Sequence, residues 1–276
     1  MDEAGATLRQ ALGQATARIV GVSDSPRLDA ELLAAHALGC SREAMLLARL
    51  DEPVPADFAA LVDRRLTHEP VAYITGSRAF WTIALLVGPG VLVPRADSET
   101  LIEAAVEHFA GRSPGRILDL GTGPGTLLLA ALDEWRGATG LGVDTSDVAL
   151  DYARRNGAAL GMDKRVTWRL GDWTAGIDEC FDLILTNPPY IGTEEALPQE
   201  VVGHEPAGAL FAGQDGLDDY RRIIPELVRL LAPHGIAAIE IGHAQGDAVT
   251  ALVRDAGLPA RLARDLGGRP RCVIAG

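Results

Sequence analysis

The sequence predicts an α/β protein in which a doubly wound parallel sheet follows a small helical domain. From about residue 97 onward, short apolar runs alternate with segments of helical periodicity, which is typical of parallel strands joined by helices. Residues 1–75 show helical spacing alone. The chain has 276 residues, a length that fits about two domains.

The N-terminal 75 residues are expected to form the helical domain. Apolar residues recur at helical spacing over 29–38, and Pro55 opens a further helical segment that ends near Leu66. No β-rich pattern interrupts these helices. We expect this domain either to recognise the substrate or to brace the catalytic domain, and we favour recognition.

Residues 76–95 differ in character from the helices before them. The run from Phe80 to Val87 favours a strand, Gly88-Pro89-Gly90 breaks it, and residues 91–93 resume it. This pattern predicts a β-hairpin that links two domains. The expected organisation is a helical domain over 1–75, a hairpin linker over 76–95 and an α/β domain over 96–276.

The elements of the α/β domain alternate as in a doubly wound sheet. Near-continuous apolar runs, such as residues 183–185 and 236–239, suit parallel strands that are covered on both faces. The expected helices are 98–109, 125–135, 148–160, 219–231 and 246–256, and the expected strands are 116–120, 138–143, 166–169, 181–186, 235–241 and 271–275. Residues 191–218 have little periodicity, and so long a stretch inside a compact domain is often a functional lid.

Composition and charge exclude several classes of protein. Lys and Arg number 25 against 38 Asp and Glu, a net charge of −13, so a basic surface for nucleic acid is not expected. The three cysteines and six histidines form no pair at metal-ligand spacing, which predicts no metal site. No signal peptide and no apolar run long enough to span a membrane are evident. We expect a cytoplasmic monomer.

A glycine-rich turn follows the first strand of the α/β domain. The turn reads Gly-Thr-Gly-Pro-Gly over 121–125, and Asp144 ends the next strand, where a carboxylate can accept hydrogen bonds from ribose hydroxyls. The spacing is G-x-G-x-G and not the G-x-G-x-x-G of dinucleotide binders. This difference favours an adenosine ligand without a pyrophosphate.

A second motif, Asn-Pro-Pro-Tyr over 187–190, lies at the carboxyl end of the apolar strand 181–186. Ligands of open α/β sheets bind at that edge, and a residue before proline is held out of the helical region. The loop therefore presents acceptors, the Asn187 side-chain oxygen and the Pro188 carbonyl, that suit a planar NH₂ donor. Tyr190 adds a ring for stacking.

Together these motifs resemble the class I, Rossmann-like S-adenosylmethionine-dependent methyltransferases. The Asn-Pro-Pro-Tyr loop resembles the subset that methylates planar NH₂ nitrogens, which includes DNA adenine N6-methyltransferases and protein glutamine N5-methyltransferases.

The flanking sequence is similar to the HemK/PrmC family over nearly the whole chain. The segments that carry this similarity are Pro-Val-Ala-Tyr-Ile-Thr-Gly over 70–76, 93–99, 205–210, 215–220, 240–246 and Asp-Leu-Gly-Gly-Arg-Pro-Arg over 265–271. The family methylates the glutamine of the Gly-Gly-Gln loop of class I peptide-chain release factors. The resemblance therefore implies a protein-(glutamine-N5) methyltransferase of translation termination, with S-adenosylmethionine as cofactor and S-adenosylhomocysteine as product.

The resemblance also implies residue roles. The turn would wrap the methionine part of the cofactor, one acidic residue would bind the ribose, and a second would meet the adenine amine beside a packed tryptophan. These cofactor-binding residues are Gly121, Thr122, Gly123, Pro124, Gly125, Asp144, Asp172 and Trp173. Asn187 would bind substrate and touch the cofactor, and Pro188, Pro189 and Tyr190 would complete the glutamine pocket. The expected catalytic residues are Asn187, Pro188 and Tyr190.

Two residues depart from the family pattern. Pro124 stands where relatives often carry Ser or Thr, which removes one loop N–H, and Ala96 stands where Pro is usual. Three alternatives stay open: a sibling glutamine methyltransferase that acts on a ribosomal protein, a DNA adenine methyltransferase, and a non-catalytic cofactor-binding module.

Overall fold

The computed structural model describes residues 7–276, and this part of the chain divides into two compact units. The first unit runs up to Ser77 and also holds Leu197–His204. The second unit comprises Arg78–Ala196 and Glu205–Gly276. A short segment from the middle of the α/β region therefore belongs to the N-terminal unit, which the sequence pattern did not predict.

The first unit is helical. Its helices are α1 (Leu8–Ile19), α2 (Pro26–Ala37), α3 (Arg42–Ala48), α4 (Phe58–Leu66), α5 (Val71–Thr75) and α9 (Gln199–His204). Thr7 and Gln10 form a reciprocal capping box that fixes the start of α1. The buried apolar faces of α1, α2 and α4 meet in one core that includes Leu12, Leu33 and Phe58.

Arg65 of α4 is a buried charge that organises this unit. Its guanidinium donates to the carboxylates of Asp29 and Glu200, each at 2.7 Å, and to the carbonyl of Val22 at 3.2 Å. Glu200 lies on α9, so this ion pair attaches α9 to the helical unit. A buried charge is tolerated only when it is paired in this way.

We expect Arg65→Met to lower the free energy of unfolding by about 3 kcal/mol, because it leaves the buried Asp29 carboxylate without its partner. Chemical denaturation of the full chain measures the change. Arg18→Met removes the exposed ion pair with Asp63 in the same unit and should cost less than about 1 kcal/mol. Equal losses in the two variants would show that Arg65 adds nothing beyond a surface ion pair.

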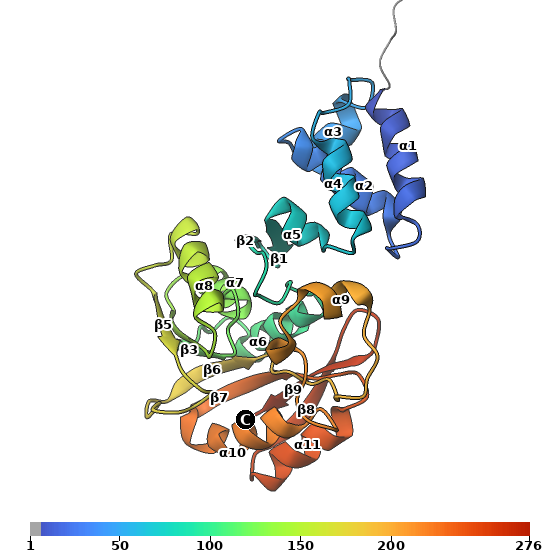
Figure 1. The fold of residues 1–276 in the computed structure, drawn as a ribbon. Helices are drawn as coiled ribbons and strands as arrows, with labels where there is room; N and C mark the ends of the chain where they lie inside the picture. The colour runs from blue at the N-terminus through green and yellow to red at the C-terminus, as the bar shows by residue number, and fades with distance from the viewer. Residues whose placement is uncertain (1–6) are drawn as a thin grey trace, which may run out of the picture. The chain divides into compact units, whose positions relative to one another are not determined.

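The second unit is built on a seven-stranded sheet in the order β5-β4-β3-β6-β7-β9-β8 (Figure 1). The parallel strands are β3 (Arg116–Leu120), β4 (Thr139–Asp144), β5 (Val166–Leu170), β6 (Phe181–Thr186) and β7 (Leu231–Glu240). Two strands, β8 (Ala260–Arg264) and β9 (Pro270–Ala275), complete the sheet in antiparallel pairing. The sequence pattern did not predict β8, whose residues are half exposed and lack an apolar run.

Helices cover both faces of this sheet (Figure 1). One face carries α6 (Glu99–Phe109), α7 (Thr126–Glu134) and α8 (Asp147–Ala159), and the other carries α10 (Asp218–Leu230) and α11 (Gly246–Asp255). The apolar runs predicted for parallel strands are buried on both sides, as Leu118 and Ile184 illustrate. Strand order reverses between β3 and β6, which opens a crevice at the carboxyl ends of these strands.

The hairpin differs from the one that the sequence pattern predicts. Its strands are β1 (Ser77–Phe80) and β2 (Ile83–Leu86), joined by a turn at Trp81 and Thr82, and residues 91–93 form no strand. Trp81 adopts a left-handed φ of 53°, its N–H donates to Glu99 at 2.8 Å, and the Thr82 hydroxyl donates to Asp133 at 2.6 Å. Trp and Thr favour strands locally, so the prediction of one strand over 80–87 was wrong because tertiary partners create the turn.

The segment expected to be an aperiodic lid contains local structure. Within 191–218 lie α9 and a short 3₁₀ helix, η2 (Ala207–Ala209). Helix α9 is too short for periodicity to reveal it, and its position depends on the ion pair between Glu200 and Arg65 of the same unit. Among residues 7–276 no helix is both long and apolar enough to cross a membrane.

Candidate active site

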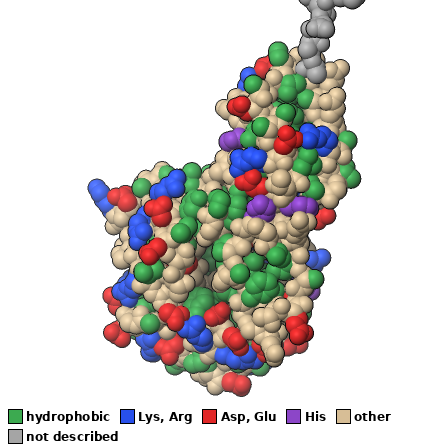
Figure 2. All heavy atoms as spheres, in the orientation of Figure 1, with side chains coloured by type: hydrophobic (Ala, Val, Ile, Leu, Met, Phe, Trp, Pro, Cys, Tyr) green, Lys and Arg blue, Asp and Glu red, His purple; other side chains and the backbone are tan. Residues whose placement is uncertain are grey.

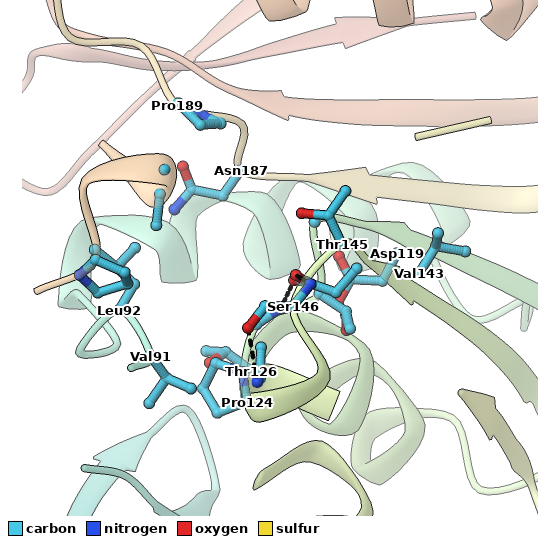
Figure 3. A pocket seen from close by; sticks show the side chains of 18 of the residues that line it. Val91, Leu92, Asp119, Pro124, Thr126, Val143, Thr145, Ser146, Asn187 and Pro189 are labelled. Atoms are coloured by element: carbon cyan, nitrogen blue, oxygen red, sulfur yellow. Dashed lines mark hydrogen bonds between the residues drawn. The ribbon is translucent and has the colours of Figure 1, made fainter. Parts of the chain in front are cut away.

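A cavity of about 350 Å³ opens at the carboxyl ends of β3, β4 and β6. The turn after β3, the ends of β4 and β6, the segment before α6 and the start of α10 all contribute to its lining. Figure 3 shows Asn187 and Pro189 at one end of the view, Pro124 and Thr126 at the other, and Val91 and Leu92 along one side. The cavity therefore occupies the crevice that the strand order predicts.

The glycine turn needs glycine at three positions. Gly121, Gly123 and Gly125 have φ values of 70°, 56° and 86°, which residues other than glycine rarely adopt. A Cβ on Gly121 would also lie 3.0 Å from the Trp173 ring. The turn therefore brings backbone close to the cavity and to Trp173.

Asp144 is bound directly to this turn. One carboxylate oxygen accepts from the Gly123 N–H at 2.8 Å and the other from the Ser146 N–H at 2.9 Å. Each oxygen keeps a further lone pair for a ligand hydroxyl. Pro124 has no N–H, but its carbonyl accepts from the buried Asn156 amide at 2.9 Å, which holds the turn against α8.

Asp119 is a cavity residue that the sequence analysis did not single out. It is 1% exposed, and one carboxylate oxygen accepts from the Thr122 hydroxyl at 2.6 Å and from the Leu128 N–H at 3.2 Å. The other oxygen has no hydrogen-bond partner among residues 7–276. Burial raises the pKa of Asp119 to about 7, against the opposing effect of the hydrogen bond from Thr122. A charged residue inside the apolar strand 117–120 was the signal that could have identified it.

Asp172 and Trp173 also line the cavity. The Asp172 carboxylate pairs with Arg222 at 2.5 Å, and the Trp173 ring N–H donates to Asp219 at 3.0 Å. Burial raises the pKa of Asp219. Arg222 and Asp219 come from α10 and also line the cavity. Asp219 lies in the family segment 215–220, but no role was predicted for it, and no motif marks Arg222.

The Asn-Pro-Pro-Tyr loop begins where β6 ends. Asn187 and Pro189 line the cavity, Pro188 is buried, and Tyr190 packs against the core of the sheet. Burial raises the pKa of Tyr190 to about 12, so its hydroxyl stays protonated at neutral pH. Of the residues predicted for the site, Gly125, Pro188 and Tyr190 are absent from the described lining of the cavity. Each of the three is next in the chain to a residue that does line the cavity.

The Gln245 side chain holds the Asn-Pro-Pro-Tyr loop through hydrogen bonds. Its amide donates to the Tyr190 carbonyl at 2.9 Å and to the Gly216 carbonyl at 3.2 Å, and its oxygen accepts from the Gly242 N–H. Gly216 has a φ of 70°, and a Cβ on this residue would lie 2.2 Å from the Tyr190 carbonyl oxygen. The loop is therefore rigid because three chain segments meet at it.

The cavity rim near residue 93 is held by Glu205. Its buried carboxylate accepts from the Val93 N–H at 3.2 Å and from Arg95 at 2.5 Å. Pro94, Arg95, Pro206 and residues 208–209 line the cavity on either side of this contact. Both segments carry family motifs, but the contact between them was not predicted from the sequence.

Comparisons with known proteins agree with this architecture. Residues 10–76 match the PrmC N-terminal domain family, and residues 112–257 match a methyltransferase domain family. The release factor glutamine methyltransferase of Rhodospirillum rubrum is 45% identical over 94% of this chain and 81% of its own. The Moorella thermoacetica protein of the same name is 40% identical over 98% of both chains. The chain belongs to the release factor glutamine methyltransferase family.

Family membership confirms two predictions. The resemblance to the HemK/PrmC family is confirmed, and the chain is an enzyme of the methyltransferase class. The Rossmann-like fold is confirmed as well, since a solved methyltransferase from Pyrococcus furiosus aligns with a TM-score of 0.50 at 17% identity, over 69% of this chain and 87% of that one. The roles of individual site residues remain predictions.

Proposed function

We propose that this enzyme transfers a methyl group from S-adenosylmethionine to the side-chain nitrogen of the glutamine in the Gly-Gly-Gln loop of class I release factors. The observation that carries the proposal is the position of Asn187, whose carboxamide lines the same cavity as the glycine turn and Asp144. The names of relatives at 40–45% identity support the choice of substrate.

The residues around the cavity fit the proposed cofactor. The unpartnered oxygen of the buried Asp119 suits an ammonium group, and Asp144 suits a ribose diol beside the turn. Asp172 and Trp173 would hold the adenine, since a carboxylate and an aromatic ring lie together on that wall. When bound, S-adenosylmethionine supplies an electrophilic methyl group.

The protein's own residues would orient the substrate amide. An amide nitrogen is a poor nucleophile because its lone pair is delocalised into the carbonyl. The Asn187 oxygen and the Pro188 carbonyl would accept both amide hydrogens, aim the nitrogen and favour the positive charge that develops on it. No strong general base is required, because the proton can leave after transfer.

Charge at the surface favours a protein substrate over nucleic acid. The net charge is −13, and on the described part of the face in Figure 2 basic side chains are interspersed with acidic ones and form no continuous stripe.

We further propose that the helical domain, residues 1–75, recognises the release factor, and that the enzyme acts as a monomer. The domain boundaries at 76–95 and 96–276 belong to the same proposal.

The test is peptide mass spectrometry of a class I release factor after incubation with the enzyme and S-adenosylmethionine. We expect one added methyl group on the glutamine of the Gly-Gly-Gln loop and none when that glutamine is replaced by alanine. No transfer, with the cofactor shown to bind by calorimetry, would contradict the proposed substrate. The same assay with ribosomal proteins, and then with DNA, would test the two alternative substrates.

A further inference from the structure

The Asn187 carboxamide can point in two directions that differ only in the exchange of its oxygen and nitrogen. Only one direction presents the acceptor oxygen to an amide donor in the cavity. In the structure the Asn187 Nδ2 donates to the Ser98 Oγ at 3.4 Å, which leaves Oδ1 free for a ligand. Ser98 is therefore placed to decide the direction.

Ser98 occupies the N-cap position of α6, where serine normally accepts from a backbone N–H of the first turn. Its side chain makes no such bond. The buried hydroxyl instead accepts from Asn187 and lies beside the carboxylate of Glu240, the last residue of β7, whose pKa it lowers. The Ser98 side chain therefore does not cap α6.

Glu240 determines what the Ser98 hydroxyl can do. An ionised carboxylate only accepts hydrogen bonds, so a Ser98 O–H directed at Glu240 donates to it, and the Ser98 oxygen is left to accept from Asn187. Glu240 is 1% exposed, and its second oxygen has no partner among the described residues. We propose that Ser98 and Glu240 are positioning residues that hold the Asn187 carboxamide with its oxygen toward the substrate.

The charges around Glu240 make this relay sensitive to pH. Burial raises the pKa of Glu240 to about 7, and Asp97 adds to this rise, against the opposing effects of the Ser98 hydroxyl, Arg271 on β9 and Arg95. Tyr190, Tyr220 and Cys272 also face it, but burial raises the pKa of each thiol or phenol, so they stay neutral near pH 7. A protonated Glu240 can donate to the Ser98 oxygen. The Ser98 O–H is then free to donate to Asn187, and the carboxamide is no longer held in one orientation.

Activity measurements with three variants test the proposal, which rests on the proposed methyl transfer. We expect Ser98→Ala to lower kcat about tenfold, the effect of one misplaced hydrogen bond in a transition state, with KM and the Kd for S-adenosylhomocysteine little changed. Ser98→Thr keeps the hydroxyl and should restore kcat. Wild-type kcat at saturating cofactor should rise with pH through about 7, the value given by the Glu240 pKa, and Glu240→Gln should be slower and lack this rise.

A spectroscopic measurement separates this proposal from the proposed function. The chain contains two asparagines, Asn156 and Asn187, so labelling with ¹⁵N-asparagine yields two side-chain amide signals. Ser98→Ala should shift the Asn187 signal and speed its exchange with water, while the buried Asn156 signal stays in place as the control. If the wild-type enzyme transferred no methyl group, the proposed function would be overturned, but the change in the Asn187 signal could still be measured. An unchanged Asn187 signal, an unchanged kcat, or a parallel loss of cofactor affinity would overturn the positioning role.

Discussion

Replacement of Asn187 by alanine should lower the rate of methyl transfer about a thousandfold, because it removes an acceptor that orients the substrate nitrogen and stabilises its developing charge. The loop should survive, since Gln245 and Gly216 hold it through the Tyr190 carbonyl and the adjoining backbone. Single-turnover transfer to a release factor, followed by mass spectrometry, measures the loss.

Cofactor affinity is the internal control for this variant. Calorimetry with S-adenosylhomocysteine should give a Kd within about threefold of the wild type, since the Asp119 and Asp144 carboxylates would carry most cofactor contacts. An equal loss of transfer and of affinity would mean that Asn187 serves mainly the cofactor. In that event the glutamine pocket would have to be sought elsewhere around the cavity.

Asp119→Asn should weaken the binding of S-adenosylhomocysteine by more than about tenfold, because the amide cannot pair with the ligand's ammonium as a charge. In the wild type this affinity should depend on pH. Asp119 must be ionised to bind the ammonium, and its pKa in the free enzyme is raised to about 7. Affinity should therefore fall about eightfold between pH 7.5 and pH 6, as the ionised fraction falls.

Two controls accompany this experiment. Asp178→Asn removes an exposed carboxylate before β6, at the sheet edge opposite the cavity, and should leave both affinity and its pH dependence unchanged. The free Asp119→Asn protein should also unfold at a higher temperature than the wild type at pH 8. A carboxyl whose pKa is higher folded than unfolded costs stability once pH rises above the unfolded value. A Kd for Asp119→Asn equal to the wild-type value would remove Asp119 from the cofactor site.

Much of the α/β unit could be predicted from local sequence because its signals are local. Apolar runs buried on both faces marked β3, β6 and β7, and glycines that require left-handed backbone marked the turn at 121–125. The two prolines of the Asn-Pro-Pro-Tyr loop restrict their own φ and the backbone of the residue before each of them, which is also a local effect. These patterns act over a few residues, so they can be read without knowing the fold.

Residues that act through distant partners could not be predicted in that way. The turn at Trp81 depends on Glu99 and Asp133, α9 depends on Arg65, and the cavity rim depends on the contact of Glu205 with Val93 and Arg95. In each case the local sequence favoured another conformation or none. The deciding hydrogen bond joins residues between 18 and 135 positions apart.

The sequence by itself determined most strands of the sheet and the two motifs that meet at its carboxyl edge, because the physical constraints on glycine, proline and buried strands are carried by neighbouring residues. The class of enzyme followed from the resemblance of these motifs and their flanking segments to a known family. Only the tertiary structure decided that Asp119 is buried with an unpartnered oxygen and that Ser98 lies between Asn187 and Glu240. Burial and hydrogen-bond partnership are properties of the whole packed unit, and no segment of the chain contains them alone.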